Sequence, residues 1–450
     1  MTAFNNNLYG IDNLAFLFGY SNDIPADFQV IEKIKLLFSE QIGSFRNTKF
    51  SPDVTFNIFI RQILSTDGSC RQAIADAISA GLIDSQSLDT GAYCHARERL
   101  PESLFTECAR LFYEICSEQV SPYFQHWNGY HLKIIDGTTL SMPDTPENQQ
   151  AYPQPDTQSP EVGFPLLRMV ICVCLMTGAV VDYSYAPYQG KLTGEHSLFR
   201  AILDGCVNSM DLILGDRYYP SFWMMWALKK RNADGLFESH ASRIIDFKKG
   251  QIVDTLDHIV EWEKPTKPEW MSKDEYDQIP ELIKVREFKY GKKMLVTTIL
   301  DNKKFPKKKL GKLYFQRWYV ETDIGALKTT MGMDVLRCKT PENIAREIGA
   351  HIVTYNFARI LIGRSTRIKN IKPRNISYKS VIQLVNAFKS ELSNAASISE
   401  FKNIVSHMMS LLVKERVQNR PGRKEPRAVK RRPKPYPRLQ VSRKAARACL

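Results

Sequence analysis

Residues 312–330 read KLYFQRWYVETDIGALKTT, with apolar residues recurring at the spacing of an amphipathic helix. Four side chains with polar groups, Tyr314, Arg317, Glu321 and Lys328, are 3, 4 and 7 positions apart. At about 100° of turn per residue they fall within an arc of about 60°. A neighbouring stripe is apolar and should be the buried side of the helix; it consists of Leu313, Val320, Ile324, Leu327 and Met331.

The face around Glu321 has two readings from spacing alone. Arg317 and Glu321 are four positions apart, so they suit an exposed helix pair worth about 0.2–0.5 kcal/mol. The alternative is a functional carboxylate between cations, which requires other acids elsewhere in the chain.

Two other acids follow short apolar runs. Residues 131–136, HLKIID, predict a strand that ends in Asp136, and residues 211–215, DLILG, predict a strand that leads into Asp216. Strand ends are where open α/β sheets place their sites. The competing reading is plain turn chemistry at Asp-Gly and Gly-Asp-Arg. Both acids together with Glu321 favour a site.

The chain has 450 residues and a formal net charge of +14, and that charge is unevenly placed. Residues 414–450 carry 14 Lys/Arg and two Glu, so nearly all the excess positive charge lies in this tail. A basic tail of this kind indicates a polyanion, nucleic acid before membrane. A merely solubilising tail is the alternative. If the tail binds DNA, removing residues 417–450 should weaken binding and flatten its salt dependence, and an unchanged salt slope would refute that role.

The nine cysteines show no Cys-x-x-Cys pair and no disulfide spacing, which suits a reducing cytosol. The first residues, MTAFNNN, contain no signal-peptide pattern, and the most apolar window, residues 169–181, is too short to span a bilayer. We therefore expect no membrane association and a cytoplasmic, nucleoid-associated protein of a bacterium.

The pattern along the chain predicts an α/β protein with helical regions at both ends. Helical spacing covers most of residues 1–122, strands alternate with helices from about residue 131, and a predicted hairpin at 282–300 belongs to a β-rich block. Long amphipathic helices follow from residue 342, and residues after 416 predict a disordered tail. The expected domains are 1–122, 123–236, 237–300, 301–365, 366–413 and 414–450.

Three carboxylates with neighbouring cations suit a site for phosphoryl transfer with two divalent metal ions. Carboxylate oxygens are ligands for Mg²⁺, and two such ions about 4 Å apart serve in-line displacement at phosphorus. Arg317 and Lys328 are suited to neutralise phosphate oxygens nearby.

The pattern Tyr314-x2-Arg317-x3-Glu321-x6-Lys328 resembles the Y-R-E-K pattern of DDE transposases of the insertion-sequence-four type. Asp136 in IIDGTT and Asp216 in LGDRYY look like the first and second catalytic aspartates of that family, and Glu321 looks like the third acid. The resemblance covers about residues 55–365 well and the tail only loosely.

The resemblance implies an RNase H-like catalytic core in two parts, 123–236 and 301–365, with residues 237–300 as an inserted β-rich module. Residues 1–122 would be the domain that binds the DNA ends. Asp136, Asp216 and Glu321 would be both catalytic residues and ligands of two Mg²⁺ ions, with Mn²⁺ as a possible substitute. Tyr314, Arg317 and Lys328 would contact DNA phosphates.

The reaction implied is cut-and-paste transposition of an insertion sequence. The partners are double-stranded DNA, both terminal inverted repeats and target, and a second copy of the chain on paired ends. Relatives also cut the second strand through a hairpin and stack a flipped base on a tryptophan. Trp262 is the choice here, with Trp270 and Trp318 as alternatives and core packing as the competing reading for each.

Two other functions compete with an active transposase. A catalytically silent DNA-binding relative would keep the fold without the activity, but all three acids are present. An inverting glycosidase also works with an acid and a base, but neither the basic tail nor the cations beside Glu321 suit it.

Overall fold

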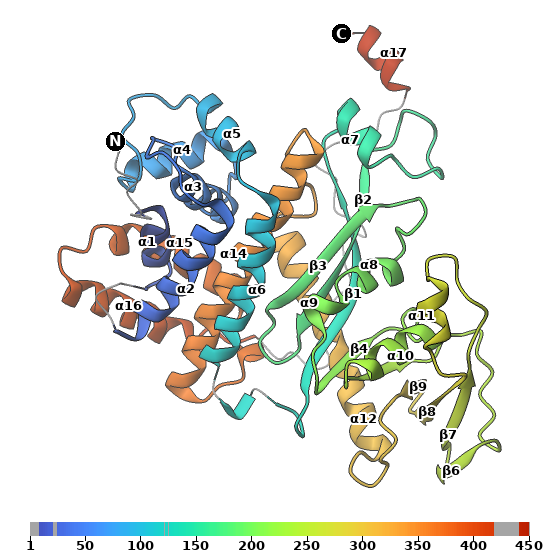
Figure 1. Ribbon diagram of the computed structural model, residues 1–450. Coiled ribbons are helices and arrows are strands. Elements are labelled where there is room, and N and C mark those ends of the chain that lie inside the picture. Colours follow the sequence, from blue (N-terminus) through green and yellow to red (C-terminus); the bar gives the residue numbers. More distant parts are fainter. Residues whose placement is uncertain (1–8, 21–24, 121, 125, 418–440, 450) are drawn as a thin grey trace, which may run out of the picture.

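The computed structural model describes all residues except 1–8, 21–24, 121, 125, 418–440 and 450. A mixed sheet lies at the centre, with helices from both ends of the chain gathered beside it (Figure 1). No helix among the described residues is long and apolar enough to cross a membrane.

The helices before the sheet follow the predicted helical spacing. They are α1 (Tyr9–Leu17), α2 (Pro25–Ile42), α3 (Pro52–Leu64), α4 (Cys70–Ser79), α5 (Gly91–Glu98) and α6 (Glu102–Gln119), followed by the 3₁₀ turn η1 (Pro122–Phe124). Prediction and structure agree most closely at α6. Pro101 caps this helix, and buried Leu104, Phe105 and Cys108 begin its apolar side.

The central sheet contains β1 (His131–Ser141), β2 (Leu166–Cys174), β3 (Val180–Pro187), β4 (Asp211–Gly215), β5 (Asp234–Glu238), β6 (Gln251–Asp254), β7 (Asp257–Glu263), β8 (Leu282–Tyr290) and β9 (Lys293–Thr297). Their order is β3-β2-β1-β4-β5-β9-β8-β7-β6. The strands β1, β2 and β3 pair antiparallel, whereas β4 runs parallel to β1 and β5 parallel to β4.

The two faces of the first five strands contribute to separate cores, as the alternation of side chains along a strand requires. On one face, Leu132 and Ile134 belong to the same core as residues of α6 and of α14 (Pro341–Lys369). On the other, Ile135 shares a core with residues of α8 (Glu195–Ala201) and α10 (Phe222–Lys230). The result is a helix–sheet–helix sandwich (Figure 1).

The strands of the block 237–300 extend this sheet. Pairing of β9 with β5 joins β6–β9 to the first five strands. The predicted hairpin is confirmed as β8 and β9, and Gly291 between them has φ +59°, a left-handed conformation that glycine adopts without strain. The short helix α11 (Lys273–Asp277) lies between β7 and β8.

Two predicted helices are less regular than expected. The amphipathic pattern of residues 193–208 is that of one helix, but the structure breaks it at Ile202 into α8 and α9 (Leu203–Cys206). The segment around Glu321 consists of four consecutive helical segments of different pitch. They are α12 (Lys307–Tyr314), the 3₁₀ turn η2 (Phe315–Trp318), α13 (Tyr319–Gly325) and the π-helical η3 (Ala326–Thr330). Its apolar stripe is nevertheless buried, except that Ile324 is only partly so.

Helices complete the chain. Figure 1 shows α14 beside α6, between the sheet and the remaining helices. The other elements are α7 (Pro146–Ala151), which lies in the predicted loop 143–165, η4 (Pro373–Asn375), α15 (Tyr378–Ser393), α16 (Ile398–Leu412) and α17 (Arg443–Ala448). Most of the predicted disordered tail, residues 418–440, lies outside the described residues, but α17 shows that its end contains a helical turn.

Candidate active site

Asp136 and Asp216 lie side by side because of the register of two parallel strands. Ile134 of β1 is level with Leu214 of β4, so the residues two positions further along each chain are also level. The prediction that Asp136 ends its strand is wrong: β1 continues to Ser141, paired with β2 throughout. Pairing with β4 does stop before Asp136, so its edge toward Asp216 is free of ladder bonds.

Glu321 reaches this edge from α13, which packs against β1. Arg317 connects the acids, with one guanidinium nitrogen 3.4 Å from Asp136 Oδ2 and another 3.6 Å from Glu321 Oε1. The side chains of Arg317 and Asp136 are each 19% exposed and that of Glu321 is 39% exposed. The site is thus partly open to solvent, and a cation lies between two of its carboxylates.

Burial has the largest effect on the ionisation of Asp136, and two neighbouring acids add to it. Burial raises the pKa of Asp136 to about 6, against the lowering effects of the Gly137 N–H, which donates to Oδ1 at 2.9 Å, and of Arg317. The charges of Asp216 and Glu195 raise it further. Asp136 therefore ionises at the expense of folding unless positive charge is supplied.

Glu195 is a fourth acid at this edge that the sequence analysis missed. It is the first residue of α8, and its carboxylate packs so closely on Gly137 that a Cβ there would lie 2.4 Å from Glu195 Cδ. Tyr219, three residues after Asp216, donates a 3.3 Å hydrogen bond to Glu195 Oε2. Burial and the charge of Asp216 raise the pKa of Glu195. The only sequence signal was an acid in the first turn of a helix after β3, which is too common to single out.

Lys328 and Tyr314, also part of the predicted pattern, have other contacts. Lys328 donates to Thr138 Oγ1 at 3.2 Å and to the Thr139 carbonyl at 2.8 Å, so it fixes η3 to β1. Tyr314 is buried and its hydroxyl donates to Glu238 at 3.3 Å.

Trp262 is placed in the second core and is 4% exposed. Its Nε1 donates to Glu287 at 3.0 Å, and the guanidinium of Arg243 lies 3.7 Å from its ring centroid. This placement argues against the prediction that Trp262 stacks on a flipped base. Of the alternatives, Trp270 is partly covered by Arg200, whereas Trp318 is 63% exposed on η2, one residue from Arg317.

The carboxylates of Asp136, Asp216 and Glu321 are suitable ligands for divalent cations, but they do not lie close enough together to hold one ion. Carboxylate oxygens are the ligands that Mg²⁺ and Mn²⁺ prefer. Within the described residues, however, no three His, Cys, Asp or Glu side chains converge closely enough to hold one metal ion. The guanidinium of Arg317 lies between Asp136 and Glu321 in this arrangement.

Comparisons with known proteins concern the family of the chain. The family model of the transposase DDE domain matches residues 127–357, which include all three acids. The chain is 26% identical over 365 residues to the transposase InsG for insertion sequence element IS4 of Escherichia coli (strain K12), covering 77% of each chain. A cryo-EM structure of the piggyBac transposase synaptic complex with hairpin DNA aligns over 94% of this chain and 88% of that one. That match has 10% identity and a TM-score of only 0.42.

A family match over this part of the chain defines the class of protein: the chain belongs to the DDE transposase family. It is of the IS4 type, as the Y-R-E-K pattern predicted, and its function is transposition. Metal-dependent cleavage of DNA is general for this family.

Proposed function

We propose that this transposase moves an insertion sequence by cutting DNA at the terminal inverted repeats and joining the freed ends to target DNA, with Asp136, Asp216 and Glu321 as its catalytic residues. The observation that carries the proposal is the meeting of Asp136 with Asp216 and Glu195 at one edge of β1 and β4, where Arg317 also joins Asp136 to Glu321. Burial raises the pKa of Asp136 to about 6, and the charges of Asp216 and Glu195 raise it further.

The strand order supports an RNase H-like core. Three antiparallel strands, β3-β2-β1, continue into two parallel ones, β4 and β5, with helices on both faces. We propose domain limits of 1–122 for end binding, 123–236 and 301–365 for the core, 237–300 for the insertion and 366–413 for the C-terminal helices. Residues 414–450 would be the basic tail.

The three acids would hold two Mg²⁺ ions, with Mn²⁺ as a substitute. When bound, such ions activate the attacking oxygen and stabilise the leaving oxygen of an in-line displacement at phosphorus. Arg317 would then leave its contacts with Asp136 and Glu321 and neutralise a phosphate oxygen. Tyr314 and Lys328 would contact DNA phosphates after releasing their present contacts with Glu238 and Thr138. Exposed Trp318 is the better placed tryptophan for stacking.

Double-stranded DNA, as element ends and as target, is the proposed partner. Joining two ends in one event favours a homodimer on paired ends. A silent DNA-binding relative is the second candidate. The one observation in its favour is that Arg317 now lies where positive charge would otherwise be supplied by metal.

A strand-cleavage assay with Mg²⁺ on DNA carrying the element ends tests the proposal. Changing Glu321→Gln or Asp136→Asn should abolish cleavage and leave end binding largely intact, because each change removes a ligand charge and keeps the side-chain volume. Retained cleavage in either variant contradicts the metal assignment. Binding without cleavage by the unaltered chain, at any Mg²⁺ or Mn²⁺ concentration, identifies the silent relative.

A further inference from the structure

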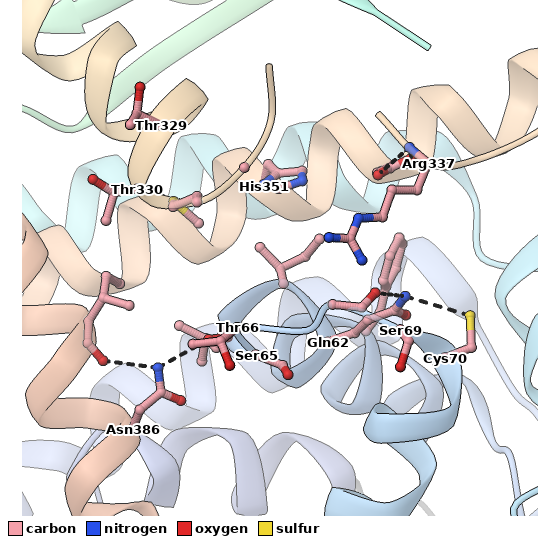
Figure 2. A pocket seen from close by; sticks show the side chains of 18 of the residues that line it. Gln62, Ser65, Thr66, Ser69, Cys70, Thr329, Thr330, Arg337, His351 and Asn386 are labelled. Carbon is pink, nitrogen blue, oxygen red and sulfur yellow. Dashed lines mark hydrogen bonds between the residues drawn. The ribbon is translucent and has the colours of Figure 1, made fainter. Parts of the chain in front are cut away.

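A cavity lies away from the carboxylates, between helices from the N-terminal and C-terminal parts of the chain. It has a volume of about 640 Å³ and is enclosed by α3, the loop to α4, the end of η3, α14 and α15. Figure 2 shows Gln62, Ser65 and Thr66 on one side of it and His351 of α14 on the other. Its volume is within the range of small-molecule sites, about 300–1,000 Å³. We call it the Arg97–Arg337 pocket.

Positive charge dominates the lining of the pocket. Arg97, Arg337 and Lys379 all line it, and among the described residues none has a carboxylate within ion-pairing distance. Glu347 is the acid in the lining, and its two oxygens already accept backbone N–H bonds of 2.9 Å from Arg337 and Cys338. The guanidinium groups of Arg97 and Arg337 donate to neutral acceptors, Gln62 Oε1 and the Asp67 carbonyl, so their charges have no anionic partner that an entering anion would need to displace.

Two buried polar atoms in the lining lack a partner. Nδ1 of His351 and Nε of Arg97 make no hydrogen bond, although the two side chains are only 4% and 9% exposed. A buried polar atom without a partner has lost its hydrogen bonds to water and gained none in exchange, which is unfavourable. Burial and the charge of Arg337 lower the pKa of His351 to about 3, so its imidazole is neutral and has one nitrogen to donate and one to accept. A ligand with both donors and acceptors suits it.

The remaining wall is apolar. Phe59, Leu64 and Met331 line the pocket, and all three belong to the main core. A flat ring fits between such a wall and the polar groups of His351 and Gln62, whereas a small inorganic anion would leave most of the volume unused.

We propose that the Arg97–Arg337 pocket binds a nucleotide, with its phosphate on Arg97, Arg337 and Lys379 and its base against the apolar wall beside His351. The two possible sources are a nucleotide of bound DNA and a free nucleotide. Thr329 and Thr330 of η3 also line the pocket. Its occupant would therefore lie directly behind the turn that carries Lys328, at a place distinct from the carboxylate site.

Calorimetric titration of the full chain with deoxyadenosine monophosphate, inorganic phosphate and deoxyadenosine tests the proposal. Deoxyadenosine monophosphate should bind at least about tenfold more tightly than inorganic phosphate or deoxyadenosine. Only the nucleotide contacts both the cationic and the apolar sides of the pocket. Binding of phosphate as tight as that of the nucleotide, or no binding of the nucleotide, overturns the proposal.

Variants locate the binding. The double change Arg337→Ala/Lys379→Ala should weaken nucleotide binding by about tenfold or more, and Thr66→Trp should weaken it by filling the space without removing charge. The matched control Lys372→Ala/Lys402→Ala removes two exposed cations that do not line the pocket and should leave binding unchanged. Equal binding by all variants overturns the assignment.

A single-stranded oligonucleotide distinguishes the sources. If it displaces the bound nucleotide, the pocket takes a nucleotide of DNA; if both bind together, it takes a free nucleotide. Each result supports the pocket chemistry. Because binding rather than cleavage is measured, the result does not depend on the roles proposed for Asp136 and Glu321. The same titration on Glu321→Gln separates failure of this inference from failure of the proposed function.

Discussion

Glu321 and Asp323 are two residues apart on α13, and their surroundings are opposite. Asp323 is fully buried, and its oxygens accept from Arg359 at 2.7 Å, from Arg374 at 2.6 and 2.7 Å, and from the Tyr355 hydroxyl at 3.0 Å. Glu321 is 39% exposed and has one long contact, 3.6 Å to Arg317. A carboxylate whose oxygens all accept hydrogen bonds stabilises the fold. A carboxylate with few partners beside other acids is available for cations and substrate.

The largest effect on stability should come from removing the charge of Asp323. Asp323→Asn leaves Arg359 and Arg374 buried without their counter-charge and should cost about 3–5 kcal/mol of the free energy of unfolding. Urea unfolding measures it. Glu321→Gln is the matched control on the same helix and should change stability by less than about 0.5 kcal/mol. Similar losses in both variants would erase the distinction between the two regions.

A smaller effect of opposite sign is expected at Asp136. Its pKa is about 6 when folded, against about 3.9 in an unfolded chain, so the folded state binds more protons between these values and stability falls as pH rises through them. Without metal at pH 8, Asp136→Asn should therefore stabilise the chain by about 1–3 kcal/mol.

Two controls sharpen this result. The gain from Asp136→Asn should vanish below about pH 4, where the carboxyl is protonated in both states. Saturating Mg²⁺ should stabilise the unaltered chain more than the variant, because a ligand that binds only the folded state adds stability. A loss of stability in the variant at pH 8 without metal would show that Asp136 is satisfied in the way Asp323 is.

The smallest effect concerns Glu195. If it supports the metal ligands through Tyr219 and its packing on Gly137, Glu195→Gln should weaken Mn²⁺ binding by about tenfold, with little change in stability. Calorimetric titration with Mn²⁺ measures this. Glu261→Gln, an exposed acid on β7, serves as the control. Tighter Mn²⁺ binding in Glu195→Gln would show that the residue only crowds the site.

Local sequence patterns were enough to predict most helices and strands and to recognise the family. The helical spacing of residues 102–119, the short apolar run of β4 and the spacing of Tyr314, Arg317, Glu321 and Lys328 are properties of neighbouring residues. They can therefore be recognised without a structure. The C-terminal end of β1 could not be predicted from neighbouring residues. Its continuation past Asp136 depends on pairing with β2, which lies about 30 residues further along the chain.

Periodicity, residue type and spacing belong to neighbouring residues, so they were enough to predict most helices and strands, three candidate acids and a resemblance to the DDE transposases. Only the tertiary structure decided which groups meet: Arg317 between Asp136 and Glu321, Glu195 against Gly137, Trp262 inside a core and Trp318 outside it. Apart from the Arg317–Glu321 pair, these contacts join residues that lie far apart in the chain. Burial and charge act on them through space, which no local pattern records.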